Sequence, residues 1–255
     1  MTAQATGRLR ARFSEAPEDI EAAQRLRHEV FIAPRLGARA DGVDADAFDP
    51  LCTHALIEEV ATGRLVCCFR MMHLADGSQI ARSYSAQHYE LSGLLDYPSP
   101  MVEMGRFCAR PGYSSPDVLR VAWGAMSDYV DANGVGLLFG CSSFDGVDEA
   151  VYMDAFAYLR ARHLAPTCWQ PRVKSPSVFS FATLLGLRRP DMRLAMKRMP
   201  PLLRTYLTMG GWVSDHAVID RDLNTLHVFT GVEIDRVPAA RRRQLRAAPS
   251  QVAAG

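Results

Sequence analysis

The chain has 255 residues, with 29 lysines and arginines against 28 aspartates and glutamates, so its formal net charge is +1. Hydrophobic residues make up 48% and charged residues 22%, which is typical of a globular protein and excludes a disordered or fibrous chain. A balance this close to zero also excludes a general nucleic-acid-binding protein, because such proteins carry a large basic excess.

Cysteine usage and hydropathy bear on the compartment. Most of the six cysteines lie within apolar runs, where a thiol behaves as a small hydrophobic group, and none forms a C-x-x-C pair. The first residues contain no apolar run typical of a signal peptide. The longest uncharged stretches, 132–144 and 175–187, have 13 residues each, against about 18 for a membrane-spanning helix. We therefore expect a reduced, cytoplasmic protein that does not span a membrane.

The hydrophobic pattern predicts an alternation of strands and helices, followed by a less regular tail. In chain order, we expect a strand over 9–13, a helix beginning at Pro17, a polar loop over 35–50, a hairpin of strands 53–60 and 64–74, a strand over 101–110, a helix from Ser115-Pro116-Asp117 to Gly134, a strand over 135–144 and a helix over 147–163. The chain contains neither G-x-G-x-x-G nor a P-loop, so nucleotide binding by those motifs is not expected. This order predicts an α+β fold with a mostly antiparallel mixed sheet flanked by helices.

The polar loop carries a cluster of carboxylates. Asp41, Asp44, Asp46 and Asp49 fall within nine residues, and residues 35–59 have a net charge of −4. Their spacing does not match a calcium-binding loop. Clustered carboxylates repel one another unless a cation neutralises them. The loop is therefore either a site for an amine-bearing substrate or a solvated acidic loop.

Glu103 lies in the middle of the apolar strand over 101–110. Burial of a carboxylate is costly unless the group is paired or functional. One interpretation is a general base that acts on an amine nucleophile, directly or through water. The alternative is a structural ion pair with Arg70 or Arg106.

A basic segment follows near the C-terminal part of the chain. Residues 187–206 contain six cations and one acid, a net charge of +5, with apolar residues between the charges. We expect this segment to dock an acidic carrier protein or anionic lipid headgroups, and a solvated basic face is the alternative. The cations are Arg188, Arg189, Arg193, Lys197, Arg198 and Arg204.

Other motifs are weaker. Ser142 and Ser143 lack the G-x-S-x-G context of a nucleophilic serine. The seven histidines show no metal-ligand spacing, so no metal is expected. Asp220, Asp222 and Asn224 either line a site or cap a turn.

Two sets of motifs resemble known enzymes of the Gcn5-related N-acyltransferase (GNAT) superfamily. A resemblance to acyl-homoserine-lactone synthases is carried by Arg27-His-Glu-Val-Phe31, Asp44-x-Asp46-x-Phe48-Asp49, Arg70 and Glu103-x-x-Arg106. A closer resemblance, to the ornithine-acyl carrier protein N-acyltransferases of ornithine lipid biosynthesis, is carried by Gly140-Cys-Ser-Ser-Phe144-Asp-Gly146, Met199-Pro-Pro-Leu-Leu-Arg204-x-Tyr206-Leu, Gly211-Trp212 and Asp220-x-Asp222-x-Asn224-Thr225. Together the motifs span roughly residues 9–235.

The resemblance implies a GNAT fold and an acyl transfer reaction. We expect a single N-acyltransferase domain over 1–235, including a basic C-terminal extension from about 186, and a flexible Arg-rich tail over 236–255. The implied reaction moves a (3-hydroxy)fatty acyl group from acyl carrier protein to the α-amino group of L-ornithine, giving lyso-ornithine lipid. The implied donor is acyl-phosphopantetheine on the carrier protein, with no bound cofactor. The alternatives are the same chemistry on glutamine, an acyl-homoserine-lactone synthase, or a non-catalytic module that binds an acyl carrier or lipid.

The resemblance also implies roles for individual residues. Glu103 would be the general base, and the acceptor would be held by Asp44, Asp46, Asp49, Arg70 and Arg106. The acyl chain and phosphopantetheine would contact Phe107, Cys108, Ala109, Ser142 and Phe144. Members that use acetyl-CoA carry a pyrophosphate loop with two small residues, whereas 110–116 contains one glycine, so a carrier-tethered donor fits better. A lipid product implies transient contact of the protein with the inner face of the cytoplasmic membrane.

Overall fold

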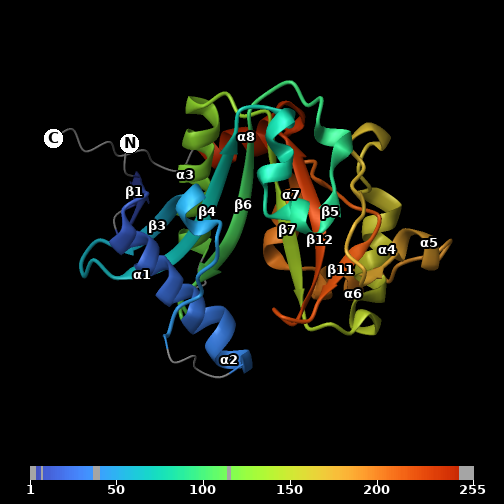
Figure 1. Cartoon of the computed structure of the whole chain (residues 1–255), viewed down its shortest axis with the longest axis horizontal. Coiled ribbons are helices and arrows are strands. Elements are labelled where there is room, and N and C mark those ends of the chain that lie inside the picture. The colour runs from blue at the N-terminus through green and yellow to red at the C-terminus, as the bar shows by residue number, and fades with distance from the viewer. Residues whose placement is uncertain (1–3, 7, 37–40, 114–115, 247–255) are drawn as a thin grey trace. The chain divides into compact units, whose positions relative to one another are not determined.

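The computed structural model describes residues 4–6, 8–36, 41–113 and 116–246 (Figure 1). The chain divides into two compact units. Unit 1 comprises residues 1–73, 104–134 and 239–255, and unit 2 comprises 74–103 and 135–238. The stretch over 1–235, expected to form a single domain, contributes to both units.

Unit 1 is built on an ordered run of neighbouring strands. Their order across the sheet is β1 (Gln4–Thr6), β2 (Leu9–Ser14), β3 (Thr53–Glu59), β4 (Leu65–Leu74) and β6 (Met101–Ala109). β3 and β4 form the predicted antiparallel hairpin, with a bulge between Ile57 and Glu58. The turn between them contains Gly63 at φ +70°, a backbone conformation that glycine adopts without strain.

The helices of unit 1 are α1 (Pro17–Arg27), which continues through a π-helical turn (His28–Ile32) into α2 (Ala33–Leu36), α3 (Pro116–Ala132) and α8 (Ala239–Arg246). Of these, α1 and α3 pack against the strands, on opposite faces of the sheet (Figure 1). Leu26 of α1 packs against Leu56 and Cys68 on one face. On the other face the ring centroids of Phe13 and Tyr129 lie 5.6 Å apart. Phe13 pairs with Ala55, and since successive side chains of a strand point to opposite faces, Phe13 and Leu56 lie on opposite faces of the sheet. The expected helix start at Ser115 lies outside the described residues, and α3 begins at Pro116.

Unit 2 contains a second run of strands, which the sequence pattern underestimated. They are β7 (Leu137–Asp145), β9 (Val178–Phe179), β10 (Trp212–Val213), β11 (Ala217–Asp220) and β12 (Thr225–Glu233). β7 pairs in parallel with the start of β6, from Met101 to Glu103, and antiparallel with all of β12. The tail that we expected to be irregular therefore supplies a long internal strand. β5 (Tyr89–Glu90) and β8 (Arg172–Val173) form a separate two-stranded sheet.

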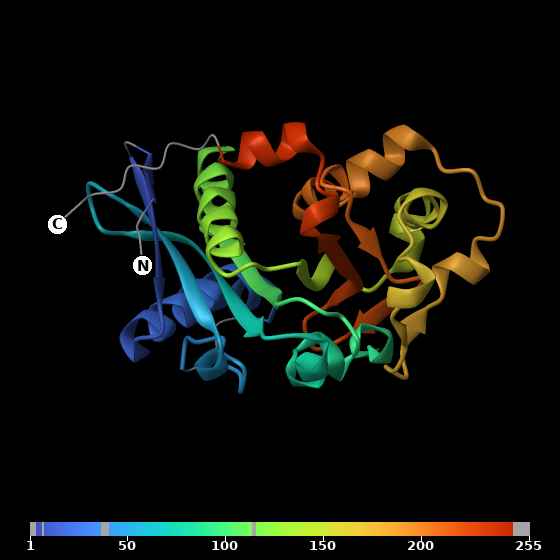
Figure 2. The ribbon, with the colours of Figure 1, turned by 90° about the horizontal axis from the view of Figure 1, so that it is seen from above.

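The helices of unit 2 surround an aromatic core. They are α4 (Met153–Arg162), α5 (Phe181–Leu184), α6 (Met192–Arg198) and α7 (Pro201–Thr208), and their colours run from yellow to orange in Figure 2. Phe144 of β7 packs against Phe156 of α4 with ring centroids 4.9 Å apart. Short 3₁₀ turns cover Asp49–Leu51, Gly77–Arg82, Ser85–Gln87, Ser92–Leu94, Glu149–Tyr152, Thr167–Trp169 and Ile234–Arg236.

Two further segments carry motifs that the sequence singled out. Asp220 accepts a hydrogen bond from the backbone N–H of Leu223 (2.9 Å), and Asn224 has φ 51°, so this motif caps the β11–β12 turn. Of the tail expected to be flexible, Ala239–Arg246 forms α8, and 247–255 lies outside the described residues. Within the described residues, none of the helices is both long and apolar enough to cross a lipid bilayer.

Candidate functional site

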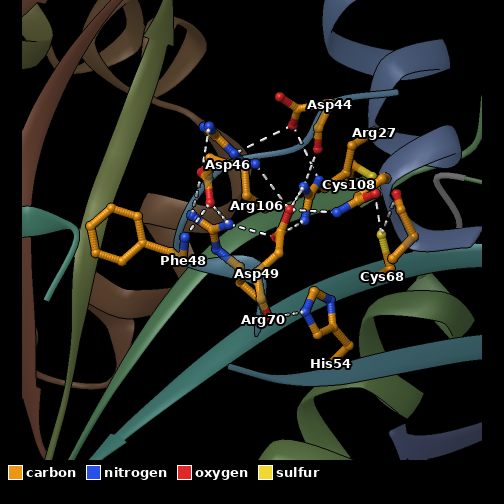
Figure 3. Close-up of polar contacts among 12 residues, drawn as sticks. Arg27, Asp44, Asp46, Phe48, Asp49, His54, Cys68, Arg70, Arg106 and Cys108 are labelled. Atoms are coloured by element: carbon orange, nitrogen blue, oxygen red, sulfur yellow. Dashed lines mark hydrogen bonds and ion pairs between the residues drawn. The ribbon is translucent and has the colours of Figure 1, made fainter. Parts of the chain in front are cut away.

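Unit 1 gathers three carboxylates and three guanidinium groups into one cluster (Figure 3). The carboxylates come from the polar loop, and the guanidinium groups come from the end of α1, from β4 and from β6. We call this the Asp–Arg cluster, and its members are Arg27, Asp44, Asp46, Asp49, Arg70 and Arg106.

Asp49 is the centre of the buried part of the cluster. Its two carboxylate oxygens each accept a hydrogen bond of 2.8 Å from Arg27, and one also accepts a 2.6 Å bond from Arg70. Gln24 donates to the same carboxylate at 2.9 Å, and His54 contacts its backbone oxygen at 3.0 Å. The side chain of Asp49 is only 2% exposed. Asp49 therefore fixes the loop to α1 and β4.

Asp46 forms the more open part of the cluster. It accepts a pair of hydrogen bonds from Arg70 (2.6 and 2.8 Å) and a 3.2 Å bond from Arg106. Arg106 also forms a 3.4 Å ion pair with Asp44. The side chain of Asp46 is 23% exposed and that of Arg106 14%. A small polar molecule would therefore meet Asp46 and Arg106 before the deeper members.

The ionised states of Asp46 and Asp49 are stabilised by the arginines. Burial alone would raise the pKa of Asp49, but hydrogen bonds from Arg27 and the charge on that residue lower it well below its ordinary value. The pKa of Asp46 is lowered for the same reason by Arg70, against the opposing effect of burial. Burial likewise lowers the pKa of His54 and favours its neutral form. The three aspartates of the cluster are thus compensated by three arginines from outside residues 35–59.

Arg106 occupies an uncommon backbone conformation. Its φ of 55° lies in the left-handed region, which non-glycine residues in strands rarely adopt. Strain of this kind persists where the surroundings hold the residue in place, and it is concentrated at functional sites. Here the ion pairs to Asp44 and Asp46 supply that support.

Glu103 lies in unit 2 and is held by hydrogen-bond donors. One carboxylate oxygen accepts bonds from the backbone N–H (2.7 Å) and the hydroxyl (2.6 Å) of Ser85. The other accepts a 2.7 Å bond from the backbone N–H of Tyr84. Such donors suit an ionised carboxylate. Arg70 and Arg106 were the two arginines considered as structural partners of Glu103. Each of them donates a hydrogen bond to Asp46.

The residues expected near the acyl donor differ in their exposure. Cys108 is buried 3.6 Å from the sulfur of Cys68, and Phe144 lies in the aromatic core of unit 2. Phe107 stacks on Phe69 with ring centroids 5.7 Å apart and is half-buried, as is Ala109. Ser142 is buried and accepts a 2.9 Å hydrogen bond from Thr230.

The basic segment retains its charge at the surface. All six expected cations are exposed, and Arg188 forms a 3.2 Å ion pair with Asp154. The described residues include no group of three or more His, Cys, Asp or Glu side chains placed to share a metal ion.

The partners of Glu103 were not predicted. Tyr84 and Ser85 lie where short 3₁₀ turns connect strands, and this stretch has no hydrophobic period. The donors also come from two backbone groups, which no residue type identifies. A polar stretch of about 25 residues between two apolar strands was the available signal of a functional loop.

The chain is similar to known acyltransferases. A family model described as an acetyltransferase (GNAT) domain matches residues 26–124. An L-ornithine N(alpha)-acyltransferase of Rhodobacter capsulatus is 33% identical over 228 residues, covering 86% of this chain and 87% of that protein. The protein of the same name from Brucella abortus is 30% identical, covering 91% and 86%. Among solved structures, a CoA-dependent acyl-homoserine lactone synthase covers 93% of this chain and 85% of its own, with 15% identity and a TM-score of 0.48.

These findings confirm the predicted GNAT-type α+β fold and the predicted class of enzyme, an acyltransferase. The sequence match extends beyond the GNAT domain, over most of both chains. The chain belongs to the family of L-ornithine N(alpha)-acyltransferases.

Proposed function

We propose that this protein transfers a fatty acyl group to the α-amino group of L-ornithine and so makes lyso-ornithine lipid. The observation that carries this proposal is 33% identity to an L-ornithine N(alpha)-acyltransferase over 86% of the chain. Two features of the structure support it: Glu103 on β6 is held by three donors, and unit 1 presents a carboxylate beside a guanidinium group.

In the proposed mechanism Glu103 is the general base. The α-ammonium group of ornithine must lose a proton before its nitrogen can attack, and a positioned carboxylate accelerates such a step by about 10²–10⁴-fold. The amine nitrogen forms a bond to the thioester carbonyl carbon, and the C–S bond of the resulting tetrahedral intermediate then breaks. The leaving thiolate takes up the second proton, which the former amine nitrogen loses, so that a neutral amide and a thiol are released, and Glu103 returns its proton to solvent.

We place the donor against the second half of β6. Backbone N–H groups of Phe107 to Ala109 are proposed to stabilise the oxyanion, each contributing about 3 kcal/mol in the transition state. The acyl chain is proposed to lie along the half-buried Phe107 and Ala109 of this strand. Since 110–116 has only one glycine, we propose acyl carrier protein rather than free CoA as the donor.

The acceptor is proposed to bind at the open part of the Asp–Arg cluster. Asp46 would attract the δ-ammonium group of ornithine, and Arg106 would attract its carboxylate. Both side chains are partly exposed, whereas Asp44 and Asp49 are buried. The buried members would then keep the exposed pair in position.

The deciding experiment supplies purified protein with 3-hydroxyacyl carrier protein and, in separate reactions, ornithine, glutamine or S-adenosylmethionine. We expect a product with the mass of acyl-ornithine. Formation of acyl-glutamine or of an acyl-homoserine lactone instead would show that the acceptor is glutamine or S-adenosylmethionine rather than ornithine. Carrier binding without any acylated amine would refute the enzymatic proposal in favour of a binding module.

The role of Glu103 is tested separately by Glu103→Gln. We expect kcat to fall by about 10²–10⁴-fold, because the amide cannot accept the proton. The matched control is Glu90→Gln, which alters a more exposed glutamate of the same unit. Full turnover by Glu103→Gln would remove Glu103 as the base and leave the overall reaction standing.

A further inference from the structure

Unit 2 exposes apolar side chains among the cations of its basic segment. Leu187 is 94% exposed and Leu184 67%, and Met192 and Leu194 are also exposed. These residues belong to α5, to the connection between α5 and α6, and to α6. In Figure 2 this segment runs along one edge of the unit. We call this the α5–α6 surface, and its cations are Arg188, Arg189, Arg193, Lys197 and Arg198.

The backbone beneath the exposed side chains is held in place. The N–H of Arg188 donates to the carbonyl of Leu185 (2.8 Å), and Arg160 of α4 donates to the carbonyl of Arg188 (3.3 Å). Asp154 of α4 accepts a 3.1 Å bond from the N–H of Asp191. Leu187 is therefore presented to solvent by an anchored connection. The exposure of a large apolar side chain on an anchored backbone needs a reason, because contiguous exposed apolar groups commonly mark an interaction surface.

The charges on this surface are arranged around the apolar groups. Leu194 has Lys197 and Arg198 at helical spacings of three and four residues, on the same exposed face of α6. Leu187 is followed directly by Arg188 and Arg189. The single acid of the segment, Asp191, is engaged in capping α6, where it accepts bonds of 2.8 and 3.0 Å from backbone N–H groups.

We propose that the α5–α6 surface binds the interface of an anionic lipid bilayer. The leucine and methionine side chains would enter the boundary between headgroups and acyl chains, while the arginines and lysine contact lipid phosphates. The acidic helix of a carrier protein would pair with the cations but would not explain the exposed aliphatic side chains. The aliphatic side chains that project between the cations match a bilayer better, since an interface offers an apolar layer directly beneath its negative charge. This binding goes beyond acyl transfer and does not depend on it.

The test measures co-sedimentation of the full chain with vesicles in the absence of any acyl donor or amine. Vesicles made of equal parts phosphatidylcholine and phosphatidylglycerol are compared with vesicles of phosphatidylcholine alone. We expect binding to the mixed vesicles that weakens with added salt. The double variant Leu187→Ser/Leu194→Ser is expected to bind at least about tenfold more weakly, because it loses the apolar contribution. The double variant Arg193→Glu/Lys197→Glu is expected to lose the preference for phosphatidylglycerol.

The matched control is Leu95→Ser, because Leu95 is 47% exposed and Leu194 45%. It should bind vesicles as the unaltered protein does. In a second measurement, Leu187→Trp should add fluorescence that brominated lipid chains quench. Wild-type protein that ignores the mixed vesicles, or a Leu187→Ser/Leu194→Ser variant that binds them normally, would overturn the proposal. A raised KM for acyl carrier protein in that variant, with normal vesicle binding, would assign the surface to the carrier instead. Neither result bears on whether ornithine is acylated.

Discussion

The position of Glu103 depends on one serine. Ser85 is fully buried and contacts the carboxylate through both its backbone N–H and its hydroxyl. The hydroxyl also lies 3.5 Å from the sulfur of Cys141. Ser85 is thus a positioning residue, which acts on the reaction through the orientation of Glu103.

Removal of the hydroxyl by Ser85→Ala should lower kcat about tenfold while KM for ornithine changes little, because a lost hydrogen bond to a charged group costs about 1.5–3 kcal/mol. The acid limb of the pH–rate profile should move to higher pH, since the carboxylate loses a donor that favours its ionised form. Steady-state kinetics across pH measure both effects. Ser92→Ala, which removes an exposed serine hydroxyl bonded to Glu90, is the control. Activity and acid limb both unchanged in Ser85→Ala would contradict this role.

Asp49→Asn should destabilise unit 1 by about 3–5 kcal/mol, because it leaves Arg27 and Arg70 buried with less opposite charge. The free energy of unfolding in urea measures the change. Asp41→Asn, on the exposed part of the same loop, should change it little. A similar loss of stability in both variants would show that the buried ion pairs are not the cause.

The same carboxylates predict a dependence of stability on pH. The folded state lowers the pKa of Asp49 and Asp46, so their contribution is fully present above the unfolded pKa of about 4 and is lost as pH falls below it. The unfolding free energy of the wild type should therefore decline below about pH 4. Asp49→Asn should show a shallower decline. An identical slope would contradict the assignment.

At the scale of elements, the pairing of β10 with β12 depends on a glycine. Gly231 lies opposite Trp212, and a Cβ atom at this position would come within 2.4 Å of the indole ring. The close contact allows the ring to lie over the strand, where its centroid is 5.8 Å from that of Phe229. Glycine is thus needed here for space.

Gly231→Ala should lower the free energy of unfolding by about 1–3 kcal/mol, because the indole must move from a well-packed position. Adding Trp212→Leu should cost less in the Gly231→Ala background than in the wild type, since the smaller side chain relieves the clash. Thermal or urea unfolding of the four proteins gives the coupling energy. Additive effects of the two substitutions would contradict the steric explanation.

The elements also show how far sequence patterns reach. The β3–β4 hairpin and β7 were predicted because each shows a local signal, a glycine turn or an apolar run. β12 was not, because it is buried on both faces and lacks the alternation of a half-buried strand. Its pairing with β7 also joins residues that are 80 (Thr225 and Asp145) to 96 (Glu233 and Leu137) positions apart, which no local pattern reports. The Asp220–Asn224 turn was the available signal for the hairpin that contains it.

The same distinction between local and long-range information applies to the candidate site. The members of the Asp–Arg cluster were recognised as residues, because charged groups in a motif are visible in a sequence. Their mutual compensation was not, because Arg27, Arg70 and Arg106 come from three separate elements. The sequence therefore predicted an acidic loop, whereas the structure shows a cluster with equal numbers of carboxylates and guanidinium groups, in which Asp46 and Arg106 are partly exposed.

For the molecule as a whole, the net charge of +1 is a sum of separate regions. The Asp–Arg cluster is balanced internally, and the excess of cations in 187–206 lies at the surface of unit 2. Overall charge therefore says little about the partners of this protein, whereas local charge does.

The six cysteines give a test of the whole fold. All are free thiols, of which only Cys168 is exposed, and Cys141 is half-buried. Burial raises the pKa of Cys67, and a hydrogen bond to Cys68 together with burial raises that of Cys108. Because the thiolate is the reactive form, a thiol reagent should modify one cysteine rapidly in the native protein. Cys168→Ser should abolish this fast phase, and several fast-reacting thiols in that variant would contradict the fold.

The Asp–Arg cluster also has a consequence for folding rates. Its hydrogen bonds join residues separated by 17 positions (Arg27 and Asp44) to 60 positions (Asp46 and Arg106). Desolvated ion pairs that close such long segments of chain should form after the folding transition state. Asp46→Asn should then accelerate unfolding in stopped-flow experiments and leave the refolding rate nearly unchanged. The cluster would thereby set how long each molecule stays folded, and a slower refolding limb would show that it forms earlier.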